Sequence, residues 1–166
     1  IKFKGQSRRV RCMAAGCGFR TSEMTSSEKL SRVYAAQESA EDALATFDPE
    51  TGDASDLATI RDDMANELRE VAQEYTDSAD NMEQSFTGGS PTIDDCREKA
   101  ENLEAWADEL EAWEPEEWEP EEPEEDEKPE EQPDDDGPRD DSGRTQSEWG
   151  EAQREALSEI VGNCPL

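Results

Sequence analysis

The chain has 166 residues, of which 46 are Asp or Glu and 16 are Lys or Arg, so its formal net charge is −30. Hydrophobic residues make up 31% of it, enough for one small domain with a thin core. Histidine is absent, which excludes Ser-His-Asp triads, Cys-His pairs and histidine metal ligands. Neither a phosphate-binding glycine loop nor a nucleophile elbow is found. We therefore expect no enzyme and no small-molecule substrate.

The first segment, residues 1–22, is predicted to be a basic arm, because its first twenty residues contain six basic residues and no acid. Residues 8–21 within it predict a short strand, a glycine-containing turn and a second short strand. If the arm binds nucleic acid, its phosphate contacts come from Lys2, Lys4, Arg8, Arg9, Arg11 and Arg20.

Two cysteines flank the expected turn, and their C-x4-C spacing resembles one knuckle of a zinc ribbon. Cys12 and Cys17 would supply only half of a tetrahedral site. Cys96 and Cys164 are the only other cysteines, and they complete a site only if the fold brings both to the knuckle. Zinc, a disulfide and free thiols all stay open, so zinc is the one candidate cofactor.

Residues 25–113 are predicted to form a helical domain. The first helix is expected to start near Thr25, where Thr25-Ser26-Ser27-Glu28 fits a capping box. Turn residues at 48–53 end this helix. Its expected core positions are Leu30, Val33, Tyr34, Ala40, Leu44 and Phe47.

The next two helices are expected over residues 55–86 and 91–113. Their apolar residues recur every three or four positions, which is the helical period, and the short loop between them predicts antiparallel packing. Trp106 and Trp113 are expected at the edge of the second stripe. The first stripe comprises Leu57, Ile60, Met64, Leu68, Val71, Tyr75, Ala79, Met82 and Phe86. The second comprises Ile93, Cys96, Ala100, Leu103, Ala107 and Leu110.

Residues 114–141 carry 17 acids, two bases and six prolines, and they predict an extended, disordered linker. A last helix is expected over 145–162, within a C-terminal segment 142–166. Its apolar side is predicted to comprise Trp149, Ala152, Ala156, Leu157, Ile160 and Val161.

The expected fold class is therefore mainly α. It is a small helical bundle built on a long antiparallel hairpin, with a short N-terminal β-knuckle and a disordered acidic tail. No run approaches the about 20 apolar residues that a membrane span needs, so no membrane partner is expected.

Residues 68–113 resemble helical-hairpin segments in uncharacterised proteins of tailed bacteriophages and haloarchaeal viruses. In those segments an amphipathic helix with Asn-Met or Asn-Leu near its end precedes a helix rich in Ala, Leu and Glu. The resemblance implies a viral or halophile origin, with the protein in the host cytoplasm or the virion. It implies no catalytic residue.

The acidity favours a non-catalytic protein that binds a basic partner, either a nucleic-acid-binding or a capsid protein. Carboxylates three or four residues apart on a helix are spaced comparably to DNA phosphates, which suggests a DNA mimic. The candidate partner-binding residues are Asp62, Asp63, Glu67, Glu70, Glu74, Glu98, Glu101, Glu104, Asp108, Glu111, Trp113 and Trp118.

Three alternatives stay open. The chain could be a structural virion or assembly protein whose helices self-associate and whose basic arm contacts nucleic acid or a neighbouring subunit. The arm could bind nucleic acid directly, with the acidic tail as an internal competitor. The acidity could instead be halophilic adaptation, or the acidic tail could serve only to keep the protein soluble.

Overall fold

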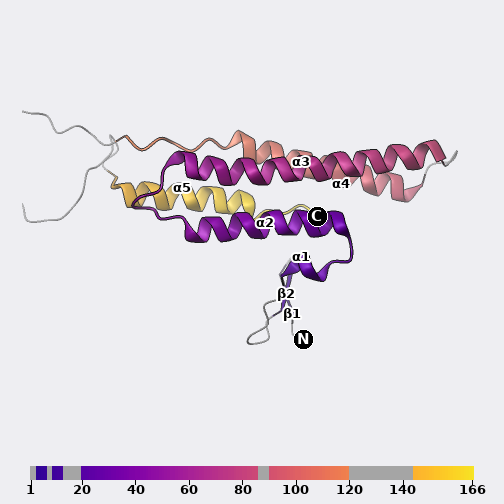
Figure 1. Cartoon of the computed structure of the whole chain (residues 1–166), viewed down its shortest axis with the longest axis horizontal. Helices are drawn as coiled ribbons and strands as arrows, with labels where there is room; N and C mark the ends of the chain where they lie inside the picture. Colours follow the sequence, from indigo (N-terminus) through magenta and orange to yellow (C-terminus); the bar gives the residue numbers. More distant parts are fainter. Residues whose placement is uncertain (1–2, 7–8, 13–19, 86–89, 120–143) are drawn as a thin grey trace, which may run out of the picture.

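The structure is a computed structural model that describes residues 3–6, 9–12, 20–85, 90–119 and 144–166, with side chains described from Arg20 onward. These residues are mainly α, as predicted (Figure 1). The helices are α1 (Thr21–Met24), α2 (Glu28–Thr46), α3 (Ala54–Ser85), α4 (Pro91–Ala112) and α5 (Gln146–Val161).

A long antiparallel hairpin of α3 and α4 forms the main part of the molecule (Figure 1). Leu57, Leu68 and Val71 of α3 and Leu103 and Leu110 of α4 are fully buried, because both stripes face the same seam. Ser90 caps α4 by accepting a hydrogen bond from the Thr92 amide, and Pro91 occupies the first turn. The predicted hairpin is confirmed. Phe86 lies outside the described residues.

The other two long helices, α2 and α5, cover one side of this hairpin (Figure 1). Val33 and Leu44 of α2 and Leu157 and Val161 of α5 join the same buried cluster as the hairpin. The end of the hairpin where α3 leads into α4 extends past α2 and α5 (Figure 1). The core therefore lies mainly where the four long helices run side by side.

The start of α2 differs from the predicted one. Ser27, not Thr25, is the cap: its hydroxyl accepts from the Leu30 amide, and Glu28 is already the first helical residue. Thr25 is instead the residue that ends α1. Leu30 and Tyr34, both predicted core residues, are only half-buried.

The basic arm contains two short strands, β1 (Phe3–Gln6) and β2 (Arg9–Cys12), which pair antiparallel with Phe3 opposite Cys12. The first predicted strand therefore pairs with the segment before it, rather than across the expected glycine turn. Thr21, assigned to the second predicted strand, begins α1. Cys17 and the rest of 13–19 lie outside the described residues.

Three tryptophan and alanine assignments also need correction. Trp106, predicted at the edge, is buried, because its indole reaches the end of α5 and donates to the Ile160 carbonyl over 2.9 Å. Ala152 and Ala156, predicted on the apolar side of α5, are exposed, while Gly150 and Gln153 are buried in their place.

Among the described helices, none is long and apolar enough to cross a membrane.

Candidate acidic partner-binding surface

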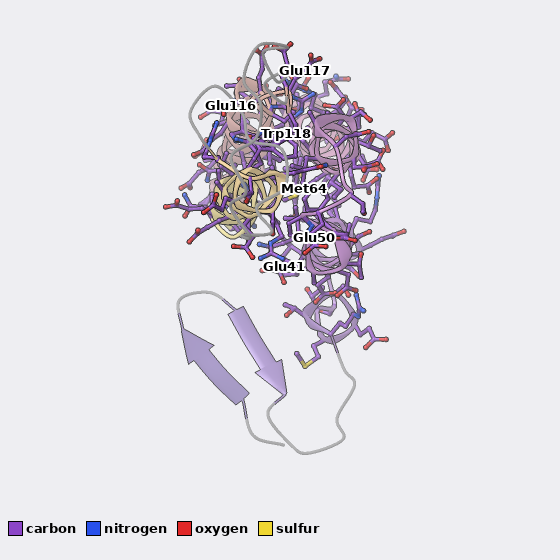
Figure 2. All side chains as sticks on the ribbon, turned by 90° about the vertical axis from the view of Figure 1, so that its left-hand side faces the viewer. Glu41, Glu50, Met64, Glu116, Glu117 and Trp118 are labelled. Carbon is purple, nitrogen blue, oxygen red and sulfur yellow. The ribbon has the colours of Figure 1, made fainter. Side chains whose placement is uncertain are left out.

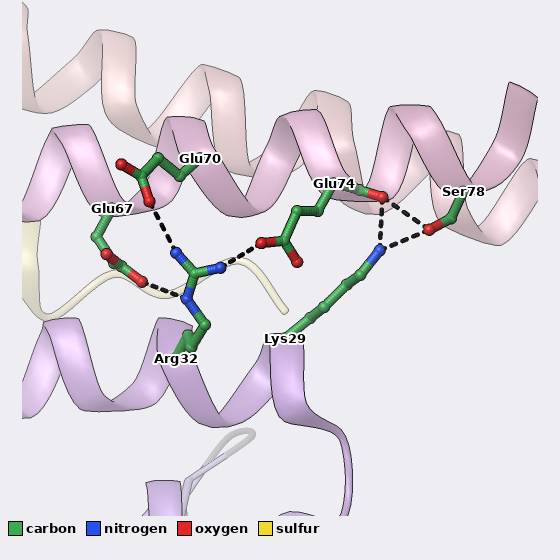
Figure 3. A network of polar contacts seen from close by, with 6 residues as sticks. All are labelled: Lys29, Arg32, Glu67, Glu70, Glu74 and Ser78. Atoms are coloured by element: carbon green, nitrogen blue, oxygen red, sulfur yellow. Dashed lines mark hydrogen bonds and ion pairs between the residues drawn. The ribbon is translucent and has the colours of Figure 1, made fainter.

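Three of the predicted partner-binding carboxylates on α3 converge on one arginine of α2 (Figure 3). Arg32 donates to Glu67 at 2.6 Å, to Glu70 at 2.9 Å and to Glu74. The hydrogen bond to Glu67 raises the pKa of Arg32 above its already high ordinary value. We call these four residues the Arg32 cluster. It retains a formal charge of −2, because one guanidinium faces three carboxylates.

A lysine one turn before Arg32 extends the junction between α2 and α3 (Figure 3). The ammonium of Lys29 donates to the Glu74 carbonyl and, at 2.7 Å, to the Ser78 hydroxyl. This cation therefore binds backbone and hydroxyl oxygens, and it leaves the three carboxylates to Arg32.

The two neighbouring aspartates of α3 lie in different settings. Asp62 pairs with Arg61, whose guanidinium also donates to the Trp113 carbonyl at 2.9 Å. Asp63 is exposed and forms no ion pair with any other described residue. The five α3 carboxylates thus do not form one uniform face. Three bind Arg32 of α2, Asp62 binds the adjacent Arg61, and Asp63 is exposed.

The carboxylates near the end of α4 face α3 across the hairpin. Arg69 donates to Asp108 at 2.8 Å and to both oxygens of Glu111. Its hydrogen bonds lower the pKa of Glu111 below the ordinary glutamate value. All three side chains are at least 40% exposed, so the surrounding water screens the pair strongly. Near the hairpin end, Arg97 donates to Glu83 at 2.6 Å and forms a longer ion pair with Asp80 at 3.8 Å.

A second group of α4 carboxylates has no cation. Glu98, Glu101 and Glu104 are exposed and form no ion pair within the described ranges. Together α3 and α4 contain 17 Asp and Glu against four Lys and Arg. Every arginine cluster on the hairpin therefore leaves excess negative charge. Side-chain oxygens, drawn in red, surround the helices when the molecule is viewed along their length (Figure 2).

The two candidate tryptophans, one at the end of α4 and one in the linker, both contact other parts of the same chain. Trp113 ends α4 and packs on the core cluster. Trp118 contacts Trp149 of α5 in a tilted arrangement, with 6.2 Å between ring centroids and 47° between the planes. The amide of Glu116 donates to the side chain of Gln153 at 3.2 Å. Residues 114–119, predicted to be disordered, are thus held against α5; residues 120–143 lie outside the described part.

One feature that the sequence analysis missed is a groove between α2 and α3, with a volume of about 350 Å³. Small side chains of α2 leave this space open, and Ile60 and Met64 of α3 form its apolar floor. Asp63, Glu67 and Arg32 line its polar side. The sequence signal was the helical stripe of small residues, Ala35, Ala36, Ser39, Ala40 and Ala43.

Only a few of the side chains proposed for the basic arm and for a metal site are described. Arg20 pairs with Asp42 of α2 at 2.6 Å, and this pairing raises the pKa of Arg20. The side chains of Lys4, Arg9, Arg11 and Cys12 are not described, and Lys2, Arg8 and Cys17 lie outside the described residues. Cys96 is a free thiol and is half-buried. From Arg20 onward, no described group of three or more Cys, Asp or Glu side chains has an arrangement suited to a metal ion.

Comparison with protein-family models, curated proteins and solved structures finds no match for this chain. The resemblance of residues 68–113 to viral helical hairpins therefore stays an expectation from the sequence.

Proposed function

We propose that this protein is a non-catalytic accessory protein of a virus or halophile that binds a basic protein through the acidic surface of its helical hairpin. The observation that carries the proposal is the incomplete neutralisation of the hairpin. Arg32, Arg69 and Arg97 each face more carboxylates than they can neutralise. A surface with this excess charge attracts cationic partners and accelerates their association.

Glu98, Glu101 and Glu104 form the best candidate contact, because they are exposed and no described cation competes for them. They lie three residues apart on a rigid helix, so neighbouring Cβ atoms are about 5–6 Å apart. Such a row of charges is comparable to phosphates along a DNA strand. This supports the DNA-mimic form of the proposal, in which the basic partner is a DNA-binding protein.

The test replaces Glu98, Glu101 and Glu104 together by Gln and measures binding of an arginine-rich peptide at increasing salt. We expect weaker binding, mainly through slower association, and a steep loss of affinity as salt rises. The matched control replaces three exposed carboxylates of α5, Glu151, Glu155 and Glu159, by Gln, which changes the net charge equally. A DNA mimic should also compete with duplex DNA for its partner.

Equal weakening by the test and control variants would show that net charge alone attracts the peptide. Binding that is unchanged between low salt and about 1 M salt would refute the electrostatic proposal. If the acidity is halophilic adaptation, the α4 variant should keep partner binding and lose stability or solubility at molar salt.

The second candidate is a structural virion or assembly protein, and the segregation of charge favours it. Six basic residues and no acid occupy the first twenty positions of a chain whose net charge is −30. Such an arm suits nucleic acid or an acidic neighbouring subunit. A structural component should co-sediment with virus particles, whereas an accessory protein should stay with the host cytoplasmic fraction.

A further inference from the structure

The groove between α2 and α3 has an apolar floor and an acidic rim. Ile60 and Met64 of α3 lie along its floor. Met64 belongs to the core cluster, and Ile60 packs against it. Asp63 is exposed and unpaired within the described residues. The Arg32 cluster adjoins it and carries three carboxylates on one guanidinium. Asp63, Glu67 and Arg32 line the groove itself, and Glu70 and Glu74 bind Arg32 next to it. Together these five side chains leave a formal charge of −3 at and next to the groove.

The α2 wall of the groove suits a close-packed helix. Ala35, Ser39 and Ala43 follow one another at intervals of four, and Ala36 and Ala40 form a parallel row. Rows of this spacing form the ridges and grooves by which helices pack, and small side chains let a neighbouring helix axis approach closely. From Ala35 to Ala43 the wall is about 12 Å long, which spans two turns of a docked helix.

We propose that this groove is the docking site for a basic amphipathic helix of the partner protein. Large aliphatic side chains one and two turns apart would enter the hollow above Ile60 and Met64, and flanking Lys or Arg side chains would meet Asp63 and the Arg32 cluster. The groove volume of about 350 Å³ is within the range of sites that hold a few such side chains. The proposal rests on the proposed function and names the structural class of its basic partner.

The test uses a synthetic helix of about 18 leucines and lysines with the leucines on one face, and a second peptide with the same composition in scrambled order. We expect the full-length protein to bind the first peptide more tightly than the second at equal salt. Replacing Ala36 and Ala43 by Leu fills the groove without changing charge. This should weaken binding of the amphipathic peptide about tenfold or more.

The matched control replaces Ala152 and Ala156 of α5 by Leu, which adds the same apolar groups at exposed positions away from the groove. We expect it to change the affinity less than about twofold. Circular dichroism and melting curves check that both variants fold. If the filled variant does not fold, Ser39→Arg blocks the groove mouth from an exposed position, with Ala45→Arg on the opposite face of α2 as its control.

Two outcomes separate this proposal from the proposed function. If the filled variant binds the amphipathic peptide as tightly as wild type, the groove proposal fails and the electrostatic function stands. If neither peptide binds even at low salt, both fail. Concentration-dependent self-association without peptide, abolished by Ala36→Leu and Ala43→Leu, would instead assign the groove to a second copy and overturn the proposal.

Discussion

The side-chain amide of Gln37 on α2 donates a hydrogen bond to the main-chain carbonyl of Val161, the last residue of α5, with 2.6 Å between nitrogen and oxygen. Trp106 of α4 makes the same kind of bond to the preceding carbonyl, that of Ile160. The last carbonyls of a helix have no partner within it. Two helices distant in sequence therefore satisfy the end of α5 and fix its position.

Replacing Gln37 by Leu should lower the free energy of unfolding by about 1–3 kcal/mol, because the buried Val161 carbonyl loses its donor while the side-chain volume is nearly kept. Urea denaturation measures this change. Gln84→Leu, at an exposed position of α3, is the control and should change the free energy by less than about 0.5 kcal/mol. Equal effects of the two would show that the hydrogen bond contributes nothing.

Leu68 lies at the centre of α3 and is fully buried, so the predicted core position is confirmed. Leu68→Ala should cost about 2–5 kcal/mol, since it removes apolar contacts and leaves a cavity. Leu30→Ala, at a half-buried position of α2, should cost clearly less. Chemical denaturation of both variants tests this order, and a smaller loss at Leu68 would contradict the packing of the hairpin.

Gly150 lies inside α5, where Gly→Ala ordinarily stabilises a helix by about 0.8–1 kcal/mol. Here a Cβ atom would lie 2.6 Å from the Pro49 carbonyl oxygen and 2.7 Å from the Pro49 Cα. Those atoms belong to the backbone and cannot rotate away. Gly150→Ala should therefore lower the melting temperature, and a rise would show that the loop yields easily.

Trp118→Ala should loosen residues 114–119 from α5, because the aromatic contact with Trp149 is lost. Such ring pairs contribute about 0.5–1.5 kcal/mol beyond the area they bury. Faster exchange of the Glu116 amide, which donates to Gln153, is the measurement. Trp118→Phe keeps a ring at the site and should change the exchange rate less. No change in exchange with Ala would mean that the tryptophan does not hold the segment.

Tyr75 is 6% exposed, and burial raises its pKa above the ordinary tyrosine value, while Ser27, the cap of α2, and Lys99 of α4 oppose this shift. A raised folded-state pKa contributes stability below the unfolded pKa of about 10 and loses it as pH rises further. Wild type should therefore lose stability above about pH 10 faster than Tyr75→Phe does. Parallel pH profiles of the two proteins would contradict this.

The groups that surround the phenol are the same in both proteins of that comparison. Lys29 lies 4.6 Å and Lys99 5.9 Å from the Tyr75 ring centre, and Asp95 and Cys96 are nearby on α4. Their own titration therefore largely cancels in the difference between wild type and Tyr75→Phe. The difference in alkaline absorbance between wild type and Tyr75→Phe follows this phenol, because Tyr34, the only other tyrosine, is present in both proteins.

The sequence alone predicted the hairpin and the last helix, because their apolar residues repeat at the helical period and their ends carry turn residues or caps. Thr145 caps the start of α5 and Gly162 caps its end, which matches the predicted limits of 145–162. Acidity at the surface was equally evident. Helix formation and capping depend on residues only a few positions apart in the chain. A periodic sequence pattern therefore predicts them directly.

Contacts between distant segments decided the rest. Periodicity could not show that Glu67, Glu70 and Glu74 would meet Arg32, since they are separated from it by 35 or more positions along the chain. Likewise, Trp106 was predicted at the edge of its helix and Trp118 in a disordered linker, but both contact α5. The groove exists only because the small side chains of α2 face α3, and that orientation is set by packing, which no local pattern contains.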